Sequence, residues 1–192
     1  GTAWAFEDRY FATNSHVISG IQEYAEQFPG TSFFVAINQR PDKRLKIVAY
    51  RKHPRYGISE TSYDGKQSLG GYDIGILRTD TAAPTHFKLA DAGKLKSLRA
   101  GVRIAYLGFP METLVDNNLN TQMPIATMQS GIVTAVSDAF MGDSGYEKNR
   151  LIRHNLPSAG GASGSPIFLG DGSVVAIHWG GNNIMRIVPN AQ

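Results

Sequence analysis

The sequence contains no cysteine, and that absence removes several classes of chemistry. With 0 Cys in 192 residues there is no disulfide framework, no thiol nucleophile and no thiolate metal site. Cysteine usage therefore gives no information about the redox compartment. The sequence also lacks any run near the ~18 apolar residues of a membrane span, so we expect no membrane insertion. Gly1 opens into structured-looking sequence, and no signal peptide is expected here.

The sequence also lacks a large net charge. The 19 Lys and Arg exceed the 16 Asp and Glu by only 3. Nucleic-acid-binding proteins usually concentrate basic side chains, interleaved with aromatic ones, on one face. We interpret the densest basic stretch as a solvated strand edge and expect no nucleic-acid partner. Its residues are Arg40, Lys43, Arg44, Lys46, Arg51, Lys52 and Arg55.

What the sequence does contain predicts an all-β protein. At 42% hydrophobic and 18% charged residues, the chain can bury a core as one domain or as two packed halves. Its 21 glycines indicate many tight turns. Short apolar runs between turn residues predict strands at 2–6, 10–13, 32–37, 45–50 and 74–78, then at 102–107, 131–137, 151–153, 166–169, 173–177 and 185–188.

These two series predict two β halves, at 1–80 and 101–192, joined by a connection at 81–100. The one good helical pattern is short and has i, i+3, i+4, i+7 spacing, with Ile21, Tyr24, Ala25 and Phe28 as its apolar positions.

The most constrained local pattern surrounds Ser163. Glycines flank this serine in Gly160-Gly161-Ala162-Ser163-Gly164-Ser165-Pro166, which indicates a sharply folded backbone with an exposed hydroxyl and converging N–H groups. A glycine-rich turn without catalysis fits the motif alone equally well. A serine nucleophile needs a base that a third group orients. His16 follows the predicted strand 10–13, and Asp73 precedes the predicted strand 74–78.

With His16, Asp73 and Ser163 in this order, the sequence resembles the trypsin-like (chymotrypsin-fold) serine proteases. The resemblance implies that His16 is the general base, Asp73 orients it and Ser163 is the nucleophile, with an oxyanion hole from the N–H groups of Gly161 and Ser163. It implies peptide or protein substrates and neither metal nor organic cofactor. His53 lies in a His-Pro-x-Tyr stretch common in the family. We therefore expect His53 not to be the base, and we interpret His86 and His154 as surface or packing residues.

Two departures from digestive trypsins resemble bacterial members of the family. Ala162 stands where those enzymes carry the aspartate that pairs with a new amino terminus, so that switch cannot operate here. Val17 stands where a disulfide cysteine usually follows the histidine. By this resemblance a secreted or periplasmic location is favoured, although the sequence itself leaves the location unknown.

The resemblance within the bacterial branch leaves two specificities open. V8-type glutamyl endopeptidases share Gly-x-Ser-Gly-Ser-Pro followed by Ile-His-Trp-Gly-Gly. This likeness implies a substrate pocket for an acidic side chain, made by Ser158, His178, Trp179, Gly180 and Gly181. The segments 101–108 and 130–134 also resemble the HtrA proteases, which favour small aliphatic residues. Because 157–162 contains no Asp or Glu, we expect no preference for Lys or Arg.

The expected fold is two packed, antiparallel, six-stranded barrels. The first barrel shows only about five predicted strands, as if its N-terminal strand were missing, and flanking segments or further domains are therefore expected. Residues 55–71 form a long predicted loop that covers the cleft or is disordered. A rival to the serine endopeptidase is a pseudoprotease that binds extended peptides by strand addition without cutting them.

Overall fold

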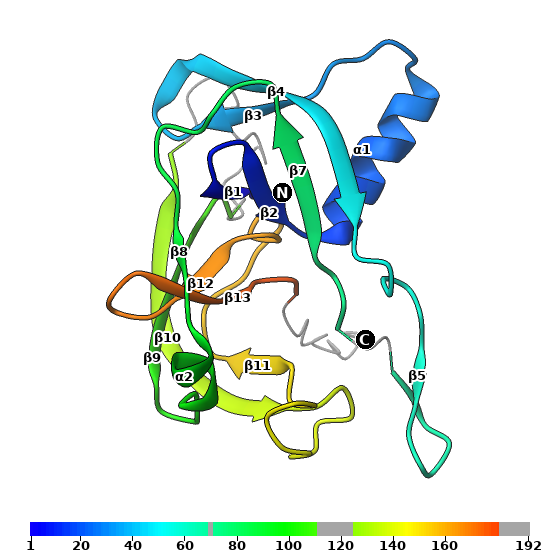
Figure 1. The fold of residues 1–192 in the computed structure, drawn as a ribbon, viewed down its shortest axis with the longest axis vertical. Coiled ribbons are helices and arrows are strands. Elements are labelled where there is room, and N and C mark those ends of the chain that lie inside the picture. The colour runs from blue at the N-terminus through cyan, green and yellow to red at the C-terminus, as the bar shows by residue number, and fades with distance from the viewer. Residues whose placement is uncertain (69–70, 111–124, 181–192) are drawn as a thin grey trace, which may run out of the picture.

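The computed structural model describes residues 1–68, 71–110 and 125–180, and in them the predicted β fold is confirmed. Two curled sheets lie one above the other (Figure 1). The first has the order β1-β2-β7-β4-β3, and the second has the order β11-β10-β9-β12-β13-β8. The strands of the first sheet are β1 (Trp4–Glu7), β2 (Tyr10–Thr13), β3 (Phe34–Ile37), β4 (Arg40–Lys52) and β7 (Gly75–Thr79).

The second sheet is built from the later part of the chain. Its strands are β8 (Lys88–Leu89), β9 (Arg103–Gly108), β10 (Thr127–Ser137), β11 (Leu151–His154), β12 (Pro166–Phe168) and β13 (Ser173–Ile177). β5 (Glu60–Thr61) and β6 (Gln67–Ser68) form a separate hairpin. The helices are α1 (Ser15–Gln27) and α2 (Ala92–Lys96). The predicted strand at 185–188 lies outside the described residues.

Short apolar runs between turn residues made the strands predictable, as β7 illustrates. In β7 the residues Gly75, Leu77 and Thr79 are buried, whereas Ile76 and Arg78 between them are exposed, as expected for a strand with one face on the core. Leu77 packs in a cluster with Phe11 of β2 and Ile18 of α1. The second sheet has its own apolar cluster around Tyr106. Each sheet therefore buries its own core.

The basic stretch lies on β4 as far as Lys52. Its first half pairs with β3 and its second half with β7, and its basic side chains reach solvent. Two other expectations about local structure need correction. The predicted loop after Arg55 contains the β5–β6 hairpin, and Arg150 and Arg55 both form ion pairs with Glu60. The predicted connection contributes β8, which pairs in parallel with β13.

α1 begins earlier than its predicted apolar face. Ile18 is fully buried and holds the helix on the first sheet, whereas Tyr24 and Phe28 are 50% and 51% exposed and pack on each other with ring centroids 4.7 Å apart. Among the described helices, none is long and apolar enough to cross a membrane.

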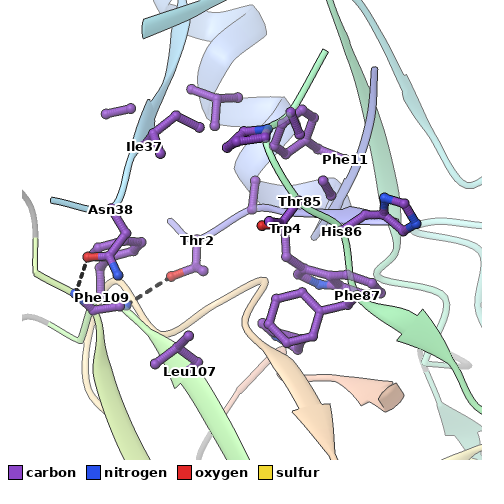
Figure 2. Close-up of a pocket in the computed structure, with 18 residues that line it drawn as sticks. Thr2, Trp4, Phe11, Ile37, Asn38, Thr85, His86, Phe87, Leu107 and Phe109 are labelled. Atoms are coloured by element: carbon purple, nitrogen blue, oxygen red, sulfur yellow. Dashed lines mark hydrogen bonds between the residues drawn. The ribbon is translucent and has the colours of Figure 1, made fainter. Parts of the chain in front are cut away.

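A cavity of about 280 Å³ lies between β1 and β3, the two outer strands of the first sheet (Figure 2). Its apolar lining includes Trp4, Ile37 and Phe87, and its rim includes Asn38, whose Oδ1 accepts a hydrogen bond from the N–H of Ala126 at 2.9 Å. None of the predicted catalytic residues lines it.

Candidate active site

His16 and Asp73 meet where two paired strands end. β2 and β7 are antiparallel, with Thr13 opposite Gly75. His16 comes shortly after β2 and Asp73 shortly before β7, so both lie at the same edge of the sheet. α1 starts directly after β2, and it puts His16 in its first turn. Gly75 permits this close approach, because a Cβ there would overlap the side chain of Ile18.

The carboxylate of Asp73 holds His16 at two points. Its Oδ1 accepts the backbone N–H of His16 at 2.9 Å, and its Oδ2 lies 2.6 Å from His16 Nδ1. A first-turn N–H has no partner inside its own helix, so Asp73 also serves as a cap for α1, and its negative charge is favourable at this end of the helix. Since a carboxylate only accepts hydrogen bonds, the proton of the neutral imidazole lies on Nδ1. His16 Nε2 is left as a proton acceptor.

Asn14 fixes the main chain on which Asp73 sits. This residue is the N-cap of α1, but its side chain does not cap the helix. Its Nδ2 donates to the carbonyl of Asp73 at 2.7 Å instead, and Asn14 is fully buried. Ser15 adds a second tie, because its Oγ donates to the carbonyl of Ile74 at 2.6 Å. The side chain of Asp73 therefore has a well-supported backbone beneath it.

His53 has a different surrounding. Its ring stacks on Tyr72 with centroids 4.9 Å apart and 10° between the planes. Its Nδ1 accepts the backbone N–H of Arg55 at 3.2 Å. The structure therefore gives His53 a packing role beside Asp73 and no contact with that carboxylate.

Ser163 directly follows a tight turn of residues 159–162, before β12. The N–H of Ala162 donates to the carbonyl of Ala159 at 3.1 Å, and φ of Gly161 is +91°. A bond between the first and fourth residues with positive φ at the third is characteristic of a type II turn. Within the described chain, the N–H groups of Gly161 and Ser163 donate to no oxygen. Both N–H groups are therefore available to a ligand oxygen.

Thr2 joins this turn to the first sheet. Its N–H donates to the carbonyl of Ser163 at 2.7 Å, and its Oγ1 donates to the carbonyl of Gly161 at 2.9 Å. Thr13 Oγ1 donates to the carbonyl of Thr2 at 2.7 Å. The turn at Ser163 is thus tied to the strand that precedes His16. Across the described residues, however, no hydrogen bond joins Ser163 Oγ to the His16 imidazole.

The predicted substrate pocket contains a buried histidine next to Ser158. His178 is 2% exposed, and its Nε2 lies 2.8 Å from Ser158 Oγ. Burial and, to a smaller extent, the neighbouring His154 lower the pKa of His178 to about 4. The ring is therefore neutral near pH 7 and supplies no positive charge to a ligand. Trp179 and Gly180 are exposed, and Gly181 lies outside the described residues.

Sequence reasoning missed two residues at these sites. His154, which we interpreted as a surface or packing residue, has its Nε2 3.2 Å from His178 Nδ1. Its half-buried ring has a pKa that desolvation lowers. Thr2 carried no signal either, since only the fold brings it to Ser163. No group of three or more metal-ligating side chains occurs in the part of the chain that is described.

The sequence profile of the trypsin-like peptidase domain matches residues 1–177. The chain belongs to this family. A comparison with characterised protein sequences gives no significant match. Among solved structures, the trypsin-like chain is similar to Deg5, with a TM-score of 0.59 at 14% identity over 93% of this chain and 72% of that one.

The trypsin-like chain is also similar to the Rv3671c protease of M. tuberculosis in two forms. For the active form the TM-score is 0.58 at 16% identity, over 95% of this chain and 63% of that one. For the inactive form it is 0.55 at 17% identity, over 94% and 72%. Because both forms match comparably, this likeness supports the fold and does not separate an active arrangement from an inactive one.

Proposed function

We propose that the protein is a serine endopeptidase in which Ser163 is the nucleophile, His16 the general base and Asp73 the residue that orients the base. The observation that carries this proposal is the two-point contact of Asp73 with His16, which leaves Nε2 free to accept a proton. The available N–H groups of Gly161 and Ser163 support it as an oxyanion hole.

In this mechanism Ser163 Oγ attacks the substrate carbonyl carbon while its proton moves to His16 Nε2. The carbonyl oxygen becomes an oxyanion, which the N–H groups of Gly161 and Ser163 stabilise. The C–N bond then breaks as His16 gives its proton to the leaving amine, and an ester with Ser163 remains. Water, deprotonated by His16, hydrolyses that ester and restores the serine. Asp73 stabilises the imidazolium that forms in each half of the reaction.

For specificity we propose an acidic residue at P1, the substrate residue before the cleaved bond. Ser158 Oγ lies 2.8 Å from His178 Nε2, and its hydroxyl proton is available for a hydrogen bond to a carboxylate. Since His178 is neutral near pH 7, the imidazole adds no positive charge to this contact. A substrate Lys or Arg in this pocket would meet Ser158 and His178, neither of which carries a negative charge. Burying an unpaired cation costs several kcal/mol. A small aliphatic P1 residue, as in the HtrA proteases, is the competing specificity.

The second candidate is a pseudoprotease that binds extended peptides without cutting them. The absence of a hydrogen bond between Ser163 Oγ and His16 among the described residues favours it. Labelling with a fluorophosphonate separates the two functions, since the reagent requires an activated serine. We expect wild type to be labelled and Ser163→Ala not to be. Peptide binding without labelling or cleavage would support the pseudoprotease.

A peptide library then tests the specificity. Cleavage after Glu and Asp that weakens in His178→Ala supports the acidic preference. Cleavage after Ala, Val or Leu that is unchanged in this variant supports the HtrA-like one.

A further inference from the structure

A line of hydrogen bonds runs from the main chain to the Ser158 hydroxyl through two imidazoles. The backbone N–H of Leu156 is 3.2 Å from His154 Nδ1. His154 Nε2 is 3.2 Å from His178 Nδ1, and His178 Nε2 is 2.8 Å from Ser158 Oγ. Both nitrogens of both rings are thus in use.

The first of these bonds fixes the direction of all the others. A backbone N–H can only donate, so His154 Nδ1 accepts and carries no proton. A neutral His154 then has its proton on Nε2 and donates to His178 Nδ1. His178 must in turn be the neutral Nε2–H form, and it donates to Ser158 Oγ. Lowered pKa values of both rings agree with two neutral imidazoles.

Ser158 stands at the end of this line with a proton to give. Its oxygen accepts from His178, and within the described chain its hydroxyl donates to no acceptor. The residue is exposed at the surface, whereas His178 beneath it is buried. Tyr106 packs against His178 and is hydrogen-bonded to the main chain next to Ser158. Its ring stacks on His178 with centroids 5.6 Å apart and 16° between the planes, and its hydroxyl donates to the carbonyl of Pro157 at 3.0 Å.

We infer that His154 is a positioning residue that makes the Ser158 hydroxyl a hydrogen-bond donor toward the substrate. This inference rests on the proposed function, because it assigns the P1 side chain to a class, namely one with an acceptor oxygen. Without His154, His178 is free to take its other neutral form with the proton on Nδ1. Nε2 then accepts the Ser158 proton, and the hydroxyl turns its lone pairs toward a substrate carboxylate, which repels them.

A measurement on the wild-type protein tests the direction without any activity. ¹⁵N NMR of histidine side chains distinguishes the two neutral forms and the cation. Near pH 7 we expect His154 and His178 both to be neutral with the proton on Nε2. A proton on Nδ1 of either ring, or a cationic ring, overturns the inference. If fluorophosphonate does not label the wild-type protein, the proposed function fails. The NMR result still decides the direction of the hydrogen bonds between His154, His178 and Ser158.

Kinetics test the positioning role. Two peptide substrates that differ only at P1, one with Glu and one with Ala, give a ratio of kcat/KM values. In His154→Phe, which keeps a ring but removes both nitrogens, we expect this ratio to fall about tenfold, the effect of roughly one hydrogen bond. The kcat/KM for the Ala substrate and the labelling rate should change less than about twofold.

Two further variants serve as controls. His154→Gln retains a donor and an acceptor and should restore part of the ratio, whereas His86→Phe, at an exposed histidine outside the pocket, should not change it. The inference fails if folded His154→Phe keeps the wild-type ratio. It also fails if both substrates and the labelling rate decline together, since this would indicate a structural role. A wild-type preference for Ala over Glu overturns the assigned substrate class.

Discussion

The backbone N–H of Thr2 donates to the carbonyl of Ser163 at 2.7 Å, so a residue at the start of the first sheet supports the candidate nucleophile directly. The Thr2 side chain reinforces the contact, because its Oγ1 also accepts the N–H of Phe109 at 3.1 Å (Figure 2). Thr2 is 3% exposed, and its polar atoms are therefore shielded from water.

We expect Thr2→Val to lower the free energy of unfolding by about 1–3 kcal/mol, because it leaves the N–H of Phe109 and the carbonyl of Gly161 without their partner. Activity should fall as the nucleophile turn loosens. Thr2→Ser keeps the hydroxyl and should behave much more like wild type. Urea denaturation and peptide turnover measure the two effects, and equal losses in both variants would show that the hydrogen bonds of the hydroxyl do not account for the loss.

Asp73→Asn should reduce kcat strongly, by roughly 10⁴-fold as in a serine protease triad of this type. The asparagine oxygen can still accept the N–H of His16, so the helix end survives. Its amide group then faces His16 Nδ1 and donates to it, which moves the imidazole proton to Nε2 and removes the base. We expect Asp73→Asn to have wild-type stability in urea denaturation and to lose peptide turnover. Full activity in a folded variant would mean that Asp73 does not orient the base.

His16→Ala and His53→Ala form a matched pair near the same carboxylate. His16→Ala should lose about 10³-fold or more in kcat, since the base is gone. His53→Ala loses its stacking on Tyr72, so some loss of stability and only a small loss of kcat are expected. Peptide turnover and thermal unfolding of both variants give the comparison. The reverse ranking in kcat would show that the wrong histidine has been assigned.

Gly164→Ala should prevent formation of the native nucleophile turn. At this residue φ is +90°, and an added Cβ would overlap the carbonyl oxygen of Thr2. The backbone strain of a positive φ and the steric overlap together cost several kcal/mol. Gly170 is the control, because an added Cβ there meets nothing within 4 Å and its φ is not positive. We expect Gly170→Ala to fold with wild-type stability, whereas Gly164→Ala should unfold at much lower urea concentration or accumulate as insoluble protein.

Stability should decrease as the pH falls from about 6.5 to about 4, in part because of His178. An ordinary histidine has a pKa of about 6.5, and burial lowers the pKa of His178 to about 4. Between these values the unfolded chain binds a proton that the folded chain does not. The free energy of unfolding then falls by about 1.4 kcal/mol per pH unit, or about 3 kcal/mol in all.

Urea denaturation at about pH 7 and pH 5 measures this loss, and the variant His178→Gln isolates it from carboxylate titration. The variant should lose less stability than wild type between the two pH values. Equal losses would show that His178 does not titrate in this range on unfolding.

The sequence was most informative where local pattern decides structure. A short apolar run predicted β7 to within one residue at each end, and β2 and β13 have the predicted bounds. The glycines around Ser163 predicted its sharp turn, which the positive φ values of Gly161 and Gly164 show.

Local pattern does not reveal contacts that depend on pairing between distant strands. β8 is only two residues long, so no periodicity marks it, and its parallel partner β13 lies far along the chain. His154 has an unremarkable sequence context and gains its role only because β11 ends beside His178. For the same reason the hydrogen bonds of Thr2 could not be predicted.

The hydrogen bond from Thr2 to Gly161 spans 159 positions of the chain. Contacts of such long range are slow to form, since the closure of a large loop costs entropy before any contact compensates for it. During synthesis on the ribosome, the support for the nucleophile turn is therefore completed only after the second sheet has emerged. A nascent chain that presents only the first sheet holds His16 and Asp73 without Ser163, so the proposed triad is incomplete until the second sheet has emerged and folded.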